Sequence, residues 1–97
     1  MRRFKDERGN EVRLTDERLR HLMKRHPEMA FQMHRFSETL ARPDVVRPSG
    51  SNQTVHLYYR LYPDLRGRNR YLCLVVKRST SYSFILTAYL ARKIKGK

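Results

Sequence analysis

The side chains best suited to move protons near neutral pH are four histidines: His21, His26, His34 and His56. Helical angles counted from Leu19 predict that His26 points inward at the end of a first helix, where the helix dipole favours a cation. The same angles place His21 on the opposite, solvent-facing side of that helix. We expect His34 at the surface and His56 on a strand. A hydrogen-bonded packing residue is the alternative interpretation of His26.

These histidines lack the spacing of a metal site. His21 and His26 are five residues apart, which separates them around a helix, and no carboxylate cluster accompanies them. The single cysteine, Cys73, excludes an internal disulfide and a cysteine-rich zinc site, and its apolar neighbours predict a buried, inert thiol. No glycine-rich phosphate loop is present. We therefore expect no metal and no cofactor.

Histidines combined with lysines, arginines and hydroxyl side chains suit RNA cleavage that needs no metal. In that reaction the 2′-hydroxyl of RNA attacks the adjacent phosphate while a base removes its proton. An acid protonates the leaving oxygen, and cations stabilise the charge that develops on the phosphate. Threonine or tyrosine hydroxyls orient a phosphate oxygen. Because DNA has no 2′-hydroxyl, this chemistry would select RNA.

The positive charge is concentrated in the second half of the chain. The net charge is +13 on 97 residues. Residues 1–44 carry 11 Lys+Arg and 8 Asp+Glu, whereas residues 45–97 carry 11 Lys+Arg and one acid, Asp64. A field of one sign attracts polyanions. Solubility charge and a membrane surface are the alternatives, but no basic amphipathic helix occurs in the second half, so nucleic acid is favoured.

The first half of the chain predicts a hairpin followed by two helices. Gly9 and Asn10 tolerate a turn between strands at 2–5 and 11–14. Thr15 is a suitable N-cap for a helix that runs to about His26, where Pro27 ends it. A second helix is expected over 28–41, with a buried stripe at helical spacing. That stripe is Met29, Met33, Phe36 and Leu40.

The second half predicts strands joined by short connections. An edge strand is expected near Val45–Arg47, followed by a loop, three longer strands and a frayed basic tail. The longer strands and the tail are expected at 54–62, 70–78, 83–91 and 92–97. The order of elements indicates one α+β domain over 1–97, in which the hairpin and two helices pack on one face of a four-stranded antiparallel sheet.

Alternation along the strands predicts which side chains the helices leave uncovered. Packing the more aliphatic face of each strand against the helices leaves a set of aromatic, cationic and hydroxyl side chains on the other face. That set is His56, Tyr58, Arg60, Tyr62, Tyr71, Lys77, Thr87 and Tyr89. Aromatic rings on a basic sheet are a common platform for single-stranded RNA, although an ordinary solvated sheet face has a similar composition. Further cations lie in or beside the connection between the strands predicted at 54–62 and 70–78. They are Arg66, Arg68 and Arg70.

The chain contains no apolar stretch of the kind that crosses a membrane. Its charged N-terminus also lacks the apolar segment of a signal peptide. We therefore expect no membrane association and a cytoplasmic location.

Several short motifs, in order along the chain, resemble phage-associated nucleases of the Barnase–EndoU–colicin–RelE (BECR) type. They span 14–28, 38–40, 42–46, 71–77 and 84–89, so the resemblance covers about residues 4–96. It implies two helices on a four-stranded antiparallel sheet and metal-free RNA cleavage. The matching polar positions are His21, His26, Lys77, Thr87 and Tyr89. Leu19 departs from the signature, which often has a tryptophan there.

The leading hypothesis is therefore a metal-independent endoribonuclease, of a toxin-like or phage-derived kind. His26 or His21 would transfer protons, Lys77 and Arg60 would stabilise charge, and the hydroxyls of Thr87 and Tyr89 would position the phosphate. Tyr58 would stack a base. The alternatives are a non-catalytic RNA- or DNA-binding module, and a basic module that docks an acidic protein such as an antitoxin or immunity protein.

Overall fold

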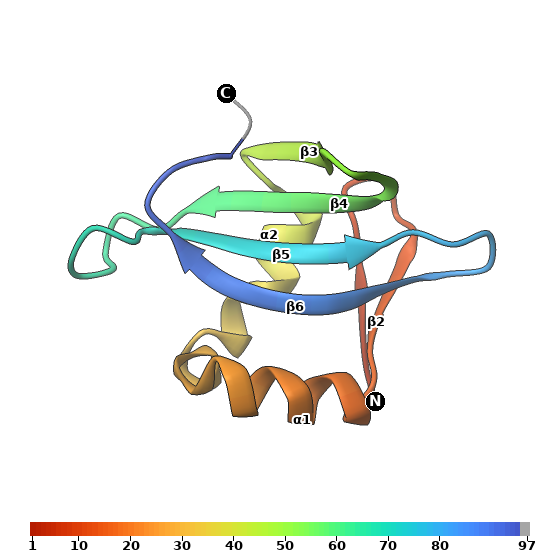
Figure 1. Cartoon of the computed structure of the whole chain (residues 1–97), viewed down its shortest axis with the longest axis horizontal. Helices are drawn as coiled ribbons and strands as arrows, with labels where there is room; N and C mark the ends of the chain where they lie inside the picture. The colour runs from red at the N-terminus through yellow and green to blue at the C-terminus, as the bar shows by residue number, and fades with distance from the viewer. Residues whose placement is uncertain (96–97) are drawn as a thin grey trace.

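The chain forms one six-stranded sheet with helical segments packed against it (Figure 1). The computed structural model describes residues 1–95. The elements follow the order β1 (Arg2–Lys5), β2 (Glu11–Leu14), α1 (Asp16–Arg25), η1 (Pro27–Phe31), η2 (Met33–Arg35), α2 (Phe36–Ala41), β3 (Val45–Ser49), β4 (Asn52–Leu61), β5 (Tyr71–Lys77) and β6 (Ser83–Ala91). The α+β class predicted from the sequence is confirmed.

The sheet is larger than predicted. The strand order is β1-β2-β6-β5-β4-β3, and strands β3 to β6 form the expected antiparallel part. The prediction of four strands in all is wrong, because the N-terminal hairpin also joins the sheet. Its strand β2 pairs with β6 in parallel, through Val12 opposite Ser83 and Arg13 opposite Phe84. This pair involves only the start of β6.

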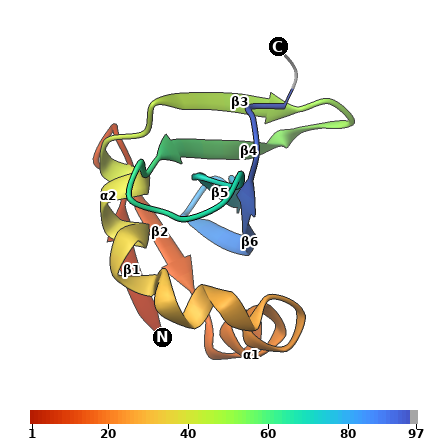
Figure 2. The same ribbon diagram turned by 90° about the vertical axis from the view of Figure 1, so that its left-hand side faces the viewer.

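The two predicted helices differ in how well they match the structure. The first is confirmed: the Thr15 hydroxyl accepts a hydrogen bond from the backbone N–H of Arg18, and the helix ends just before Pro27. The continuous helix predicted over 28–41 is wrong, because η1 and η2 precede a shorter α2. These tight turns bend the chain, so that η1 contacts α1 while α2 contacts β1 (Figure 2). Met29 and Phe36 are both fully buried on this bent path.

The core lies between the sheet and the segment from η1 to α2. The register of β4 places Tyr58 opposite Leu74 and Arg60 opposite Leu72, so these residues share the covered face. For β4, the prediction of the face that packs against the helices is therefore wrong. The residues predicted to lie on that face were Val55, Leu57, Tyr59 and Leu61. The buried cluster is Val12, Leu14, Leu22, Met29, Phe36, Leu40, Tyr58, Tyr62, Leu72, Leu74, Val76, Ile85 and Ala88.

A β-bulge changes which residues of β6 face the core. The register shifts between Val75, which opposes Thr87, and Val76, which opposes Ile85. Ile85 is fully buried, whereas Phe84 and Leu86, predicted to face the helices, are only half-buried. Beyond the bulge the predicted alternation holds. Thr87 and Tyr89 lie on the face opposite the core.

The start of the strand region also differs from the prediction. The expected loop after Arg47 is instead a continuation of β3 to Ser49, which pairs with Asn52 at the start of β4. In the tail, the backbone N–H of Lys95 donates to the Tyr59 hydroxyl at 3.3 Å, so this residue contacts the sheet. Residues 96 and 97 of the predicted tail lie outside the described part. Within residues 1–95, no helix has the length and apolar character needed to cross a membrane.

Candidate active site

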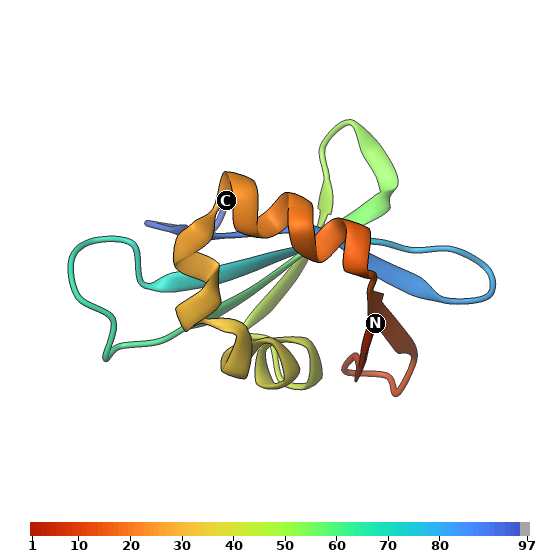
Figure 3. The same cartoon turned by 90° about the horizontal axis from the view of Figure 1, so that it is seen from below.

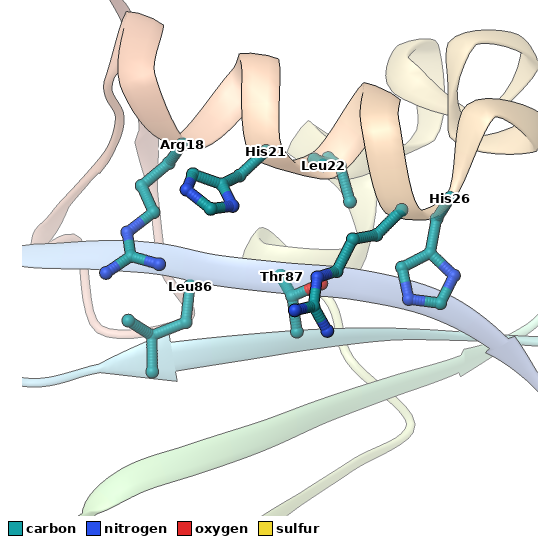
Figure 4. A pocket seen from close by; sticks show the side chains of 7 residues that line it. Arg18, His21, Leu22, His26, Leu86 and Thr87 are labelled. Carbon is teal, nitrogen blue, oxygen red and sulfur yellow. The ribbon is translucent and has the colours of Figure 1, made fainter.

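A cleft of about 370 Å³ lies between α1 and β6. Since β2 pairs only with the start of β6, helix α1 takes the place of a neighbouring strand along the rest of it (Figures 1 and 3). The helix contributes cations and histidines, and the strand contributes a hydroxyl (Figure 4). The lining residues are Arg18, His21, Leu22, Arg25, His26, Leu86 and Thr87.

His21 of α1 and His26, which follows the helix, both line this cleft. The prediction that His21 lies on the opposite side from His26 is wrong, and the backbone explains why. His26 follows the last helical residue and has φ −134° and ψ 69°, so its side chain no longer follows the helical angles. His21 is exposed and His26 is half-buried, and both rings point toward β6 (Figure 4). Solvent and a ligand can therefore reach both.

His26 has two further neighbours. Its Nδ1 lies 3.5 Å from the Glu28 carboxylate, close enough to orient the ring. On the other side, the ring centroids of His26 and Tyr89 are 6.2 Å apart. A carboxylate that orients an imidazole is the arrangement used by histidines that transfer protons.

Thr87 brings a hydroxyl to the cleft, and the ring of Tyr89 lies at its border. They alternate with the buried Ala88 and therefore share the open face of the sheet, as predicted. Burial raises the pKa of Tyr89, and the neighbouring Cys73 thiol adds to that effect. The Tyr89 hydroxyl therefore keeps its proton at neutral pH and remains a hydrogen-bond donor.

Arg18 and Arg25 are the cations of the cleft, and the sequence interpretation did not select them. They flank His21 at i−3 and i+4, the spacing that places residues on one helical face. That spacing was available in the sequence. It was missed because His21 was assigned to the solvent side and its neighbours were read as ordinary surface charge.

Lys77 lies on the open face but outside the cleft lining. It is half-buried at the end of β5, where it opposes Phe84 and Val55. Val75, two residues earlier on the same face, opposes Thr87. Lys77 therefore lies two residues beyond the partner of Thr87, on the strand β5 that pairs with β6.

Arg60 is not on the open face, contrary to the prediction. Its Nε lies 3.4 Å from the Glu38 carboxylate and its Nη1 3.9 Å from that of Asp44, and it also donates to the backbone carbonyl of Arg42. These contacts connect β4 to α2 and the segment after it. A guanidinium held in this way stabilises the fold and is separated from the cleft by the sheet.

Tyr58, Tyr62 and His56 also lie on the covered face, so their predicted placement is wrong. The Tyr58 ring is fully buried and its hydroxyl donates to Glu7 at 3.0 Å, while burial raises its pKa to about 12. The Tyr62 hydroxyl lies 3.0 Å from that of Thr39. Burial, with the Arg78 charge second, lowers the pKa of His56. Buried rings with protein partners do not stack on a base.

The remaining predicted residues are more accessible. Tyr71 lies half-buried on the open face, edge-on to Tyr59 with their ring centroids 6.5 Å apart. Arg66, Arg68 and Arg70 are exposed in the connection between β4 and β5, where Arg70 Nε donates to the carbonyl of Gly67 at 3.1 Å. This connection extends from the end of the sheet where β6 finishes (Figure 1). Its cations can contact a polyanion.

Within the part of the chain that the structure describes, no three or more His, Cys, Asp or Glu side chains gather as they would around a metal ion. Comparisons with models of protein families, with curated proteins and with solved structures find no match to this chain. The candidate site is therefore argued from its own geometry.

Proposed function

We propose that this protein is a metal-independent endoribonuclease whose active site is the cleft between α1 and β6. One observation carries the proposal: two histidines, two arginines and a threonine hydroxyl line a single solvent-accessible cleft. Tyr89 lies beside it, 6.2 Å from His26 between ring centroids. This is the set of groups that phosphate cleavage by the 2′-hydroxyl requires.

The reaction follows from the chemistry of these groups. One of His21 and His26 removes the proton of the 2′-hydroxyl, and the other protonates the 5′-oxygen as its bond to phosphorus breaks. Arg18 and Arg25 stabilise the negative charge on the phosphate oxygens. The Thr87 hydroxyl donates a hydrogen bond that positions a phosphate oxygen. The products are a 2′,3′-cyclic phosphate and a free 5′-hydroxyl.

The resemblance to BECR nucleases supports the same proposal. Four of its five matching polar positions, namely His21, His26, Thr87 and Tyr89, belong to the cleft or its border. The fifth, Lys77, lies one strand away. We include in the proposal a BECR-type fold extended by the N-terminal hairpin, a cytoplasmic site of action and an acidic antitoxin or immunity protein as a partner for the basic surface.

Incubation with single-stranded RNA in EDTA tests the proposal. We expect cleavage that yields 2′,3′-cyclic phosphate ends, and no cleavage of DNA of the same base sequence. Variants His21→Ala and His26→Ala should lose activity, and Lys77→Ala should lose less than Arg25→Ala because Lys77 does not line the cleft. The proposal is wrong if pure protein leaves RNA intact, or if EDTA abolishes the cleavage.

A binding module without catalysis is the second candidate, favoured by the exposed arginines of the connection between β4 and β5. It predicts RNA binding that weakens with salt and an intact RNA product, because each phosphate contact releases counterions. Gel analysis of the bound RNA separates it from the nuclease.

A further inference from the structure

A second cavity, of about 530 Å³, lies on the open face beside the cleft. Leu57 of β4 and Arg47 of β3 oppose each other in register and form its floor and one wall. Tyr89 forms the border between the two sites, because it lines this cavity while its ring lies 6.2 Å from His26. The tail reaches the cavity through Lys95, whose backbone N–H bonds to Tyr59 at 3.3 Å.

The apolar part of the lining suits the flat surface of a nucleobase. Leu57 and Pro48 provide aliphatic surface, and Tyr89 provides an aromatic ring. The volume of about 530 Å³ falls within the range typical of small-molecule sites, so a purine has room. Rings of this kind bind bases by stacking and by exclusion of water.

The polar part of the lining selects among the bases. Arg47 and Lys95 are donors only, the Ser49 and Tyr89 hydroxyls can donate, and no carboxylate or amide side chain lines the cavity. The Arg47 Nε is buried and has no hydrogen-bond partner among the described residues. Guanine presents O6 and N7 as adjacent acceptors that match a guanidinium fork, whereas adenine and cytosine present an amino donor.

We propose that this cavity binds an unpaired guanine next to the scissile phosphate, with Arg47 contacting O6 and N7 and Tyr89 and Leu57 packing on the ring. The inference rests on the proposed nuclease function, and it narrows the substrate to single-stranded RNA that contains guanosine. A base in a duplex cannot enter, because its ring faces are stacked on neighbouring pairs. Lys95 adds a cation on the tail side of the base.

Binding of DNA strands tests this proposal without cleavage, since DNA has no 2′-hydroxyl. Fluorescence anisotropy would compare short single strands of cytosines with one central guanine, adenine or thymine. We expect the wild-type protein to bind the guanine strand at least about fivefold more tightly than the adenine strand. Arg47→Gln should remove this preference, and so should Arg47→Lys, which keeps the charge but lacks the fork.

Arg70→Gln is the matched control, because it removes the same charge from an exposed position outside the cavity. It should weaken binding of all strands by a similar factor and leave the preference for guanine unchanged. Thermal melting of each variant checks that the fold persists. Equal binding of guanine and adenine strands by the wild type overturns the inference, and so does a preference that survives both Arg47 substitutions. If guanine is preferred but RNA is not cut, the guanine site stands and the nuclease proposal fails.

Discussion

The two faces of the sheet carry similar side chains but leave them in different states. On the covered face, Tyr58 is held by Glu7 and Arg78, and Arg60 by two carboxylates. On the open face, Thr87 lines the cleft and Arg47 lines the neighbouring cavity. Residue type alone would assign the same role to both faces. Position in the lining of a cleft or cavity distinguishes a side chain available to a ligand from a structural one.

This difference has an energetic basis. A buried hydroxyl or guanidinium that lacks a partner costs about 1–3 kcal/mol, and the contact of Tyr58 with Glu7, 51 positions away, avoids this cost on the covered face. A group beside a solvent-filled cleft avoids most of that cost, because water serves it until a ligand replaces the water. The predictions below test the contrast, starting with the largest expected effect.

The strongest contrast compares two histidines. His26→Ala should lower the rate of RNA cleavage by about 100- to 10,000-fold, because it removes one of the two groups that transfer protons. His56→Ala should leave the rate of the folded protein unchanged, since His56 lies on the covered face opposite Val76. Single-turnover cleavage with both variants measures this. An equal loss of rate in two fully folded variants would show that the open face is not the active one.

The next contrast compares two tyrosines. Tyr58→Phe should lower the free energy of unfolding by about 1–3 kcal/mol, because it leaves Glu7 and Arg78 without a buried partner. Tyr89→Phe should instead slow RNA cleavage by roughly tenfold or more and change stability little, since it removes the hydroxyl that we propose for positioning a phosphate oxygen. Urea denaturation and cleavage assays on both variants check the pair. A reversed pattern would contradict the assignment of the faces.

Alkaline pH should reveal that part of the open face is also buried. Cys73 lies on this face between Tyr59 and Tyr89, and burial raises its pKa from 9.0 to about 11. The unfolded chain loses the thiol proton first as pH rises above 9, so the free energy of unfolding should fall by about 1 kcal/mol per pH unit from 9 to 10. Urea denaturation measures it. Cys73→Ala should have a smaller slope in the same range, and an unchanged slope would refute this origin.

The smallest effect is expected at Arg60. Arg60→Gln should lower the free energy of unfolding by less than about 1 kcal/mol, because its ion pairs with Glu38 and Asp44 are partly exposed to solvent. The rate of RNA cleavage should not change. A large loss of RNA cleavage in a stably folded Arg60 variant would show that this residue takes part in cleavage.

Local signals predicted much of the fold. The hairpin was predicted from Gly9, which has φ +82°, and the first helix from Thr15 and Pro27. These features depend on residues a few positions apart. The parallel pairing of β2 with β6 could not be predicted in this way, because it joins Val12 to Ser83 across most of the chain.

The covered face of β4 was predicted wrongly for a similar reason. Leu57 and its neighbours two residues apart are more aliphatic, so local hydrophobicity favours burying them. The observed face is stabilised by the contact of Tyr58 with Glu7, which is 51 positions away, and that of Tyr62 with Thr39, which is 23 away. The direction of His26 depends on a backbone that leaves the helix, which helical angles do not describe.

Because α1 and β6 form its two walls, the cleft can form only after both segments have been synthesised. Helix α1 precedes β6 in the chain, and the elements from η1 to β5 separate the two walls in sequence. Contacts between segments so far apart in sequence form only after the intervening chain is available. A nascent chain that lacks β6 therefore has His21 and His26 but no opposite wall, and cannot hold a phosphate between them. The cleft is therefore absent until translation has passed β6.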